Sequence, residues 1–303
     1  MTMTAAPSAR RPLDGMATGL MVALCAVWGL QQVVIKATVP LMGAVLQAGL
    51  RSAIAALLVL GFALWRGTPL WRRDGTLGAG LAAGLLFGAE FYCIFVGLGH
   101  TTASRMAVFL YTAPIFTALG LHLTVDGEKL RSGQWLGVVL AFAGMALAFA
   151  DGLAGHGQRG STLLGDALGI LAGALWAATT VVVRASRLSS APASKTLLYQ
   201  LAVSAVLLLV MALASGQAAD ARVNGLVLAS LFYQSVLIAF LSYLTWFWLL
   251  GRYLASRLSV FSFLTPLFGV AFGVLLMHDA VGPRFAAAAV LVLAGIVLVN
   301  RRQ

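Results

Sequence analysis

Charged residues are scarce in this chain, and their scarcity excludes an ordinary soluble domain. Asp, Glu, Lys and Arg together make up 10% of the 303 residues, whereas 61% are hydrophobic and the mean hydropathy is +0.96. A soluble domain has about a quarter of its residues charged, because its surface faces water. A lipid bilayer accommodates the apolar excess, since one helix crosses the ~30 Å hydrocarbon core with about 20 residues. We therefore expect an integral membrane protein.

Acidic residues and cysteines are scarcer still. Nine Asp and Glu stand against twenty Lys and Arg, for a formal net charge of +11. The cations are scattered singly or in pairs between apolar runs, which favours membrane topology signals over a nucleic-acid surface. Cys25 and Cys93 lie inside apolar stretches and show no metal-ligand spacing. Because the sequence also has no phosphate-binding glycine loop and no nucleophile–base pair, we expect no metal, no cofactor and no enzymatic activity.

Continuous apolar runs, bounded by charged residues, glycine or proline, predict an all-α protein with ten transmembrane helices. In lipid only helices and closed barrels satisfy the backbone, and unbroken rather than alternating hydrophobicity favours helices. The first run is longer than the apolar region of a signal peptide, so we interpret it as a retained helix. The predicted helices cover residues 16–36, 41–65, 77–98, 103–124, 133–150, 163–184, 194–215, 225–250, 257–277 and 283–300.

Basic residues between these helices indicate the orientation of the chain. With a cytoplasmic N-terminus, fourteen of the twenty Lys and Arg residues fall on the cytoplasmic side and five on the opposite side, with Arg51 inside a helix. Cytoplasmic loops of membrane proteins carry such an excess. The five on the opposite side are Lys36, Arg105, Arg159, Arg222 and Arg284. We therefore predict a multi-pass protein of the cell inner (plasma) membrane with both termini in the cytoplasm.

The two halves of the sequence repeat each other. The segment Gly99–Arg105, followed by Pro114, matches Gly251–Arg257, followed by Pro266, at a constant offset of 152 residues. Each half holds five predicted helices, an odd number, so equivalent helices cross the membrane in opposite directions. Such inverted repeats let one half move against the other around a site near the midplane. We predict a cytoplasmic tail at 1–15 and five-helix repeats at 16–152 and 163–300.

The repeated segment and the residues that follow it resemble a known family. Tyr111-Thr-Ala-Pro114, then Asp126-Gly-Glu-Lys-Leu130 and Gln134-Trp-Leu-Gly137, are similar to the EamA branch of the drug/metabolite transporter superfamily. The resemblance implies ten helices in two five-helix halves and a secondary exporter. The aromatic content of 77–98 and 225–250 is most similar to YddG-type aromatic amino-acid exporters. One departure is that the second half has His278-Asp279 where the family has Gly-Glu, so Asp279 is a candidate substitute for that carboxylate.

Polar residues inside the first helix of each half are candidates for binding a solute. Trp28, Gln31 and Gln32 lie at spacings that place them on one helical face, and the second half repeats the pattern with an equivalent set. Polar groups inside a bilayer usually face a cavity or another helix. Both alternatives stay open here: the two sets line a central cavity, or they bond between helices. The equivalent set in the second half is Trp176, Thr179 and Thr180.

Glu90 is the one acidic residue that lies deep inside an apolar run, with Tyr92 close by. It either binds a solute ammonium or carries a proton, or it pairs with Arg51 and is neutralised. Tyr92 is a further candidate for solute contact. The position equivalent to Glu90 in the second half is Ser242, so the repeat does not require a carboxylate there.

Aromatic residues and prolines complete the candidate site. Tyr243 and Trp246 suit either a cavity for an apolar solute or an interfacial aromatic belt. Tyr111 and Phe263 occupy equivalent places three residues before a proline, and each is a candidate for solute contact. The two prolines, Pro114 and Pro266, are expected to bend their helices.

These observations together predict a secondary transporter. Since no ATP-binding motif is present, we expect solute or ion gradients to drive transport, with export of neutral or aromatic amino acids as the resemblance implies. The alternatives are an exporter of other drug-like or metabolite solutes and a membrane-embedded enzyme, which would need convergent acid, base or metal groups. We expect a small-molecule solute and the lipid bilayer as partners, no nucleic acid, and function as a monomer.

Overall fold

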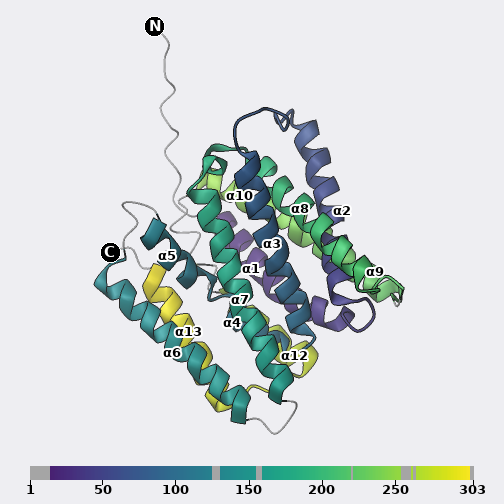
Figure 1. Cartoon of the computed structure of the whole chain (residues 1–303). Coiled ribbons are helices and arrows are strands. Elements are labelled where there is room, and N and C mark those ends of the chain that lie inside the picture. The colour runs from purple at the N-terminus through teal and green to yellow at the C-terminus, as the bar shows by residue number, and fades with distance from the viewer. Residues whose placement is uncertain are drawn as a thin grey trace.

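Long helices joined by short turns make up the described chain (Figure 1). The computed structural model describes residues 14–124, 130–154, 159–219, 221–253, 261 and 264–300. Of the predicted cytoplasmic tail at 1–15, residues 1–13 lie outside these ranges. Asp14 begins the described chain and caps the first helix, because its carboxylate accepts a hydrogen bond from the backbone N–H of Ala17 at 2.8 Å.

The helices of the first half agree with the predicted ranges to within a few residues, with one exception. That exception is the predicted helix 103–124, which is divided in two. The elements are α1 (Gly15–Thr38), α2 (Ala44–Trp65), α3 (Leu77–Leu98), α4 (Ala103–Leu110), α5 (Ala113–Thr124) and α6 (Ser132–Ala154).

The division between α4 and α5 falls at Tyr111 and Thr112, directly before Pro114. Proline has no backbone N–H, so the helical bond to the carbonyl four residues earlier is lost. Beside this break, the Thr112 hydroxyl donates to the Phe109 carbonyl at 2.6 Å. The helix is therefore interrupted rather than only bent.

In the second half, the predicted helix 225–250 contains an unexpected π-helical segment. The elements are α7 (Arg159–Arg184), the short 3₁₀ helix η1 (Arg187–Ser190), α8 (Ala193–Ala214), α9 (Gly225–Phe232), the π-helix η2 (Tyr233–Ser242), α10 (Tyr243–Arg252), α12 (Leu264–Met277) and α13 (Pro283–Asn300). Elements α9, η2 and α10 follow one another without a break. A π-helix widens the turn and is found frequently at functional sites.

Seven segments of the described chain are long and apolar enough to cross a membrane, and three shorter apolar helices accompany them. The chain is thus an all-helical integral membrane protein. The shorter three are residues 132–148, 264–277 and 283–299. The predicted helix 257–277 is described only at 261 and from 264 onward, so Pro266 is the third residue of α12 and a bend before it lies outside the described residues.

Small residues allow the helices to pack closely. A Cβ atom added at Gly84 of α3 would lie 2.8 Å from the Tyr199 carbonyl oxygen of α8. Added Cβ atoms at Gly137 of α6 and Gly295 of α13 would each meet the other's carbonyl oxygen, at 2.7 and 2.5 Å. Such close backbone approach is typical of helix packing in membranes. Figure 1 shows α6 and α13 side by side on one flank of the bundle, opposite α2.

The turn between α2 and α3 is held to the start of α8 by Asp74. Its carboxylate accepts hydrogen bonds from the Thr76 hydroxyl at 2.6 Å and from Lys195 Nζ at 2.9 Å. These hydrogen bonds, first from Thr76 and then from Lys195, hold the pKa of Asp74 well below its usual value. Lys195 also donates to the Arg72 carbonyl at 3.1 Å, so one ammonium fixes both the side chain and the backbone of the turn.

Candidate functional site

A cavity of about 600 Å³ lies between helices from both halves. Its walls come from α1, α3, the α4–α5 junction, α7, η1, α8 and α10. A volume of this size is typical of pockets that bind small molecules.

Most of the residues predicted from the sequence meet at this cavity. The polar and aromatic sets from the first helix of each half face it together, as do the aromatic residues of α10 and the α4–α5 junction. The predicted residues that line it are Trp28, Gln31, Gln32, Glu90, Tyr111, Pro114, Trp176, Thr179, Thr180, Tyr243 and Trp246.

Three predicted residues are not among the lining residues. Tyr92 does not line the cavity: it lies two positions from Glu90, on another face of α3, and packs against the main hydrophobic cluster. Pro266 is buried in α12. Phe263 lies outside the described residues.

Paired aromatic rings form two walls of the cavity. Trp28 of α1 packs edge-on against Trp246 of α10, with ring centroids 6.0 Å apart. Trp176 of α7 packs in the same way against Tyr111, at 5.5 Å. The Trp28 indole N–H also donates to the Ser242 hydroxyl at 2.8 Å, which fixes the ring. The rings therefore offer fixed apolar faces to a solute.

The two threonines of α7 offer fewer hydrogen-bond donors to the cavity than the sequence suggested. The Thr179 hydroxyl donates to the Leu175 carbonyl at 2.9 Å, and the Thr180 hydroxyl donates to the Trp176 carbonyl at 3.0 Å. Both hydroxyl protons are thus used within their own helix, so only acceptor lone pairs remain for the cavity. Gln32 of α1 is different, because its buried Oε1 has no hydrogen-bond partner.

Glu90 lines the cavity, and its buried Oε2 has no hydrogen-bond partner in the part of the chain that the structure describes. Arg51 is fully buried, and its guanidinium stacks on the ring of Phe91 with Cζ 3.8 Å from the ring centroid. Among the described residues, none of its three guanidinium nitrogens makes a well-formed hydrogen bond, and the Tyr243 hydroxyl lies near enough to interact with the group. The pairing of Glu90 with Arg51, one of the two alternatives from the sequence, is therefore not formed as a hydrogen-bonded ion pair between these two described residues.

Sequence reasoning missed several lining residues that helical spacing identifies. Phe87, Phe91 and Ile94 share a face of α3 with Glu90 and line the cavity. Spacings of three and four from Glu90 select Phe87 and Ile94, and the same spacings from these two residues select Phe91 rather than Tyr92. Gln200 of α8 also lines the cavity, and its polar side chain inside an apolar span was a signal of the same kind as Gln31.

The cavity extends toward one end of the bundle. Its lining includes Arg184 at the end of α7, Ser189 of η1 and Ala193 at the start of α8. The end of α7 and the start of α8 meet at this end of the bundle, which we call the mouth. The opposite end of α7, near Asp166, contributes no lining residue.

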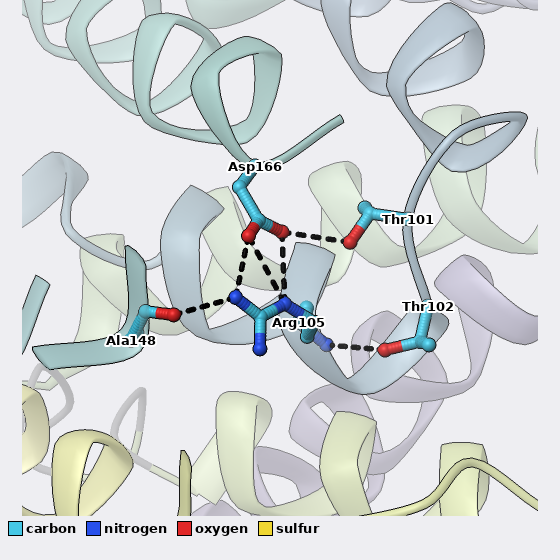
Figure 2. A network of polar contacts seen from close by, with 5 residues as sticks. All are labelled: Thr101, Thr102, Arg105, Ala148 and Asp166. Carbon is cyan, nitrogen blue, oxygen red and sulfur yellow. Dashed lines mark hydrogen bonds and ion pairs between the residues drawn. The ribbon is translucent and has the colours of Figure 1, made fainter. Parts of the chain in front are cut away.

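A buried ion pair ties the helices together at the end opposite the mouth. Figure 2 shows the Asp166 carboxylate of α7 between the Arg105 guanidinium of α4 and the Thr101 hydroxyl. Thr101 donates to Asp166 at 2.7 Å, and Arg105 Nε donates at 3.0 Å. Arg105 also donates to the Ala148 carbonyl of α6 at 2.7 Å, and the Thr102 hydroxyl caps its backbone N–H. The network was not predicted, since its ion pair joins residues 61 positions apart.

Two further side chains hold the same end. Lys36 Nζ, at the end of α1, donates to the carbonyls of Leu98 at 3.0 Å and Thr101 at 2.6 Å. Asp279, which follows α12, accepts from both the backbone N–H and the hydroxyl of Ser104 at 2.9 Å. Asp279 thus stabilises the N-terminus of α4.

These features define a class of protein: a polytopic helical membrane protein with an aromatic cavity between its helices, which, among the described residues, extends toward one end of the bundle. Within the described residues, no group of three or more His, Cys, Asp or Glu could hold a metal ion. Such an arrangement is the framework of a transporter.

Comparison with known proteins identifies the family. The model of the EamA-like transporter family matches the chain twice, at residues 15–150 and 163–301. The chain therefore belongs to this family of the drug/metabolite transporter superfamily and is a membrane transporter.

Relatives and a solved structure agree with this assignment. An uncharacterized transporter of Archaeoglobus fulgidus is 30% identical over 69% of this chain and 71% of its own. The uncharacterized transporter YvbV of Bacillus subtilis is 27% identical over 94% and 92%. A probable amino-acid metabolite efflux pump of Escherichia coli is 27% identical over 89% and 90%. A crystal structure with 17% identity matches 94% of this chain and 96% of its own with a TM-score of 0.65, which shows a shared fold.

Proposed function

We propose that this chain is a secondary transporter that exports small metabolites, neutral or aromatic amino acids foremost, by alternating access around the central cavity. The observation that carries the proposal is the cavity itself, where aromatic pairs and one carboxylate with an unpartnered oxygen face the same space. Aromatic walls suit an apolar side chain, and a carboxylate suits an ammonium group. The name of the relatives that are probable amino-acid metabolite efflux pumps supports the same solute class.

We further propose that ten transmembrane helices form two inverted five-helix repeats, at 16–152 and 163–300. The double match of the family model supports this division. Contacts between residues at the repeat offset support it as well, because residues that lie close to a two-fold axis meet their own equivalents. Ser52 of α2 and Ser204 of α8 are 152 positions apart, and their hydroxyls lie 3.2 Å from each other.

A second pair of contacts follows the same offset. The Thr101 hydroxyl donates to the Asp166 carboxylate, and the Tyr253 hydroxyl donates to the Asp14 carboxylate at 2.8 Å. Tyr253 and Asp14 each lie 152 positions from their counterparts in the first contact. Each of the two hydrogen bonds thus joins the N-terminal to the C-terminal part of the chain, and the offset of 152 residues relates one bond to the other.

The orientation from the basic residues places the mouth on the cytoplasmic side. We propose that the cavity is open inward in this conformation and that the Arg105–Asp166 network closes the outer end. Localisation in the cell inner membrane with both termini cytoplasmic, and function as a monomer, belong to the same proposal.

Uptake of labelled solute into liposomes that contain the purified protein tests this function. We expect saturable uptake of labelled phenylalanine that excess unlabelled phenylalanine blocks, with no such uptake by empty liposomes. If Glu90 carries a proton in the cycle, a pH gradient accelerates uptake and Glu90→Gln abolishes that acceleration. Arg66→Gln, which removes an exposed cation at the end of α2, is the matched control and should transport as the unaltered protein does.

Folded protein that transports no aromatic or small neutral amino acid would refute the amino-acid assignment. Uptake of apolar amine drugs by the same protein would then favour the wider class of drug-like solutes.

A further inference from the structure

Arg51 is the most unusual charged residue of the described chain. It lies in the middle of α2, with none of its surface exposed. Its guanidinium carries a permanent charge and five N–H donors, yet none of its three nitrogens makes a well-formed hydrogen bond within the described chain, although the Tyr243 hydroxyl lies near enough to interact with it. The guanidinium stacks on the face of Phe91, with Cζ 3.8 Å from the ring centroid.

A buried, unbonded cation in a membrane is costly, so its retention points to a partner in another state. Charged side chains inside membrane spans usually pair with one another or mark solute pathways. The groups that act on Arg51 electrostatically are the Tyr243 hydroxyl and the Glu90 carboxylate. Tyr243 and Glu90 both line the cavity, and so does Phe91. Arg51 therefore stands directly behind the cavity wall.

Glu90 and Arg51 are thus neighbours of opposite charge, and each has unused hydrogen-bonding capacity. Two such groups are able to form an ion pair with each other, or to bind one molecule that carries both a positive and a negative charge. An amino acid has its ammonium and carboxylate on one carbon, which matches two opposite charges held close together. Its side chain would then lie among the aromatic rings.

We propose that Arg51 is the group that binds the carboxylate of the solute, so that the cavity selects zwitterions, with the ammonium at Glu90 and the carboxylate at Arg51. This inference rests on the proposed function and names the chemical class that its site takes. The Phe91 ring swings away as the carboxylate enters. The guanidinium then exchanges a cation–π contact for charge-assisted, bidentate hydrogen bonds, which are stronger.

Three molecules that differ only in their charged groups test the proposal on the unaltered protein. They are phenylalanine, 2-phenylethylamine, which lacks the carboxylate, and 3-phenylpropanoate, which lacks the ammonium. Binding is read from the fluorescence of the tryptophans, three of which line the cavity. We expect phenylalanine to bind at least about tenfold more tightly than either analogue, because each analogue leaves one buried charge unpaired.

Variants then assign each charge to its residue. Arg51→Gln should weaken binding of phenylalanine by about 30-fold or more and leave 2-phenylethylamine within about threefold. Arg51→Lys keeps the positive charge but loses the planar guanidinium that binds a carboxylate through two parallel hydrogen bonds. It should therefore weaken the binding of phenylalanine selectively, but less than Arg51→Gln does. Glu90→Gln should weaken the binding of phenylalanine and the binding of 2-phenylethylamine, because both molecules carry the ammonium group. Arg66→Gln is again the control, with all three affinities unchanged.

The outcomes separate this inference from the proposed function. Unaltered protein that binds 2-phenylethylamine as tightly as phenylalanine overturns the role of Arg51 and leaves amino-acid transport standing. If Arg51→Gln weakens the binding of phenylalanine and of 2-phenylethylamine equally, the role of Arg51 in binding the carboxylate is overturned as well, since equal weakening indicates a structural role. If Arg51→Gln does not fold, Arg51→Lys and the ligand series on the unaltered protein decide the question. Failure of all three molecules to bind folded protein overturns both proposals.

Discussion

Replacing Asp166 with asparagine removes the negative charge from the network at the end of the bundle opposite the mouth. The Asp166 side chain is 0% exposed and that of its partner Arg105 is 9% exposed. Removing one member of a buried ion pair leaves the other charge uncompensated and costs about 3–5 kcal/mol. Asparagine keeps an acceptor for the Thr101 hydroxyl, so we expect a loss near the lower end of that range.

A double-substitution cycle distinguishes a buried pair from an incidental contact. Asp166→Leu alone should destabilise the protein more than Asp166→Asn, because it also leaves Thr101 without its acceptor. Adding Arg105→Met should recover part of the loss, since the buried guanidinium that has lost the Asp166 carboxylate is then removed as well. The recovery measures the coupling between the two side chains.

Equilibrium unfolding in mixed micelles with increasing SDS, followed through the fluorescence of the seven tryptophans, measures these changes. The control is Arg66→Gln, which alters an exposed cation and should unfold as the unaltered protein does. A loss below about 1 kcal/mol for Asp166→Asn would refute the reasoning, because that magnitude is typical of exposed pairs.

Two further predictions concern packing and pH. Gly137→Val should destabilise the contact between α6 and α13 by about 1–3 kcal/mol, because its Cβ would lie 2.7 Å from a carbonyl oxygen of α13. The control is Gly133→Ala, whose Cβ meets nothing within 4 Å and which should be nearly neutral in the same unfolding assay. Asp74→Asn should lower the unfolding midpoint at pH 7. The pKa of Asp74 is depressed in the folded protein, so the stabilisation is complete above the unfolded pKa and fades as the pH falls below about 4. The midpoints of Asp74→Asn and the unaltered protein should therefore converge in acid, and a constant difference from pH 7 to pH 3 would contradict this account.

Helix positions were largely predictable because lipid imposes one simple requirement on the sequence. A span must be apolar for about 20 residues and must satisfy its own backbone, so the boundaries of α2 and α3 follow from where charged and turn-forming residues resume. The interruption at Tyr111 and Thr112 was signalled by Pro114, but a bend and a break give the same sequence signal. The π-helical segment Tyr233–Ser242 had no recognisable signal.

The candidate site was predictable in part, because polar and aromatic residues are rare in apolar spans. Trp28 and Glu90 were conspicuous for this reason, and both line the cavity. Tyr92 was chosen by proximity along the chain, whereas the cavity wall follows the helical face that carries Phe91. The donor capacity of Thr179 was overestimated, since a hydroxyl in a helix bonds to its own backbone when no better acceptor is near.

The sequence by itself determined that this chain lies in a membrane and where most of its described helices begin and end, and its repeated segments predicted two related halves. Those properties depend on composition and on local or repeated patterns. Only the tertiary structure decided that Arg105 meets Asp166, that Lys36 donates to the Leu98 carbonyl at the same end, and that Arg51 stacks on the ring of Phe91. Such relations depend on how distant helices are rotated and paired, and hydrophobicity in a bilayer does not specify the rotation of one helix against another.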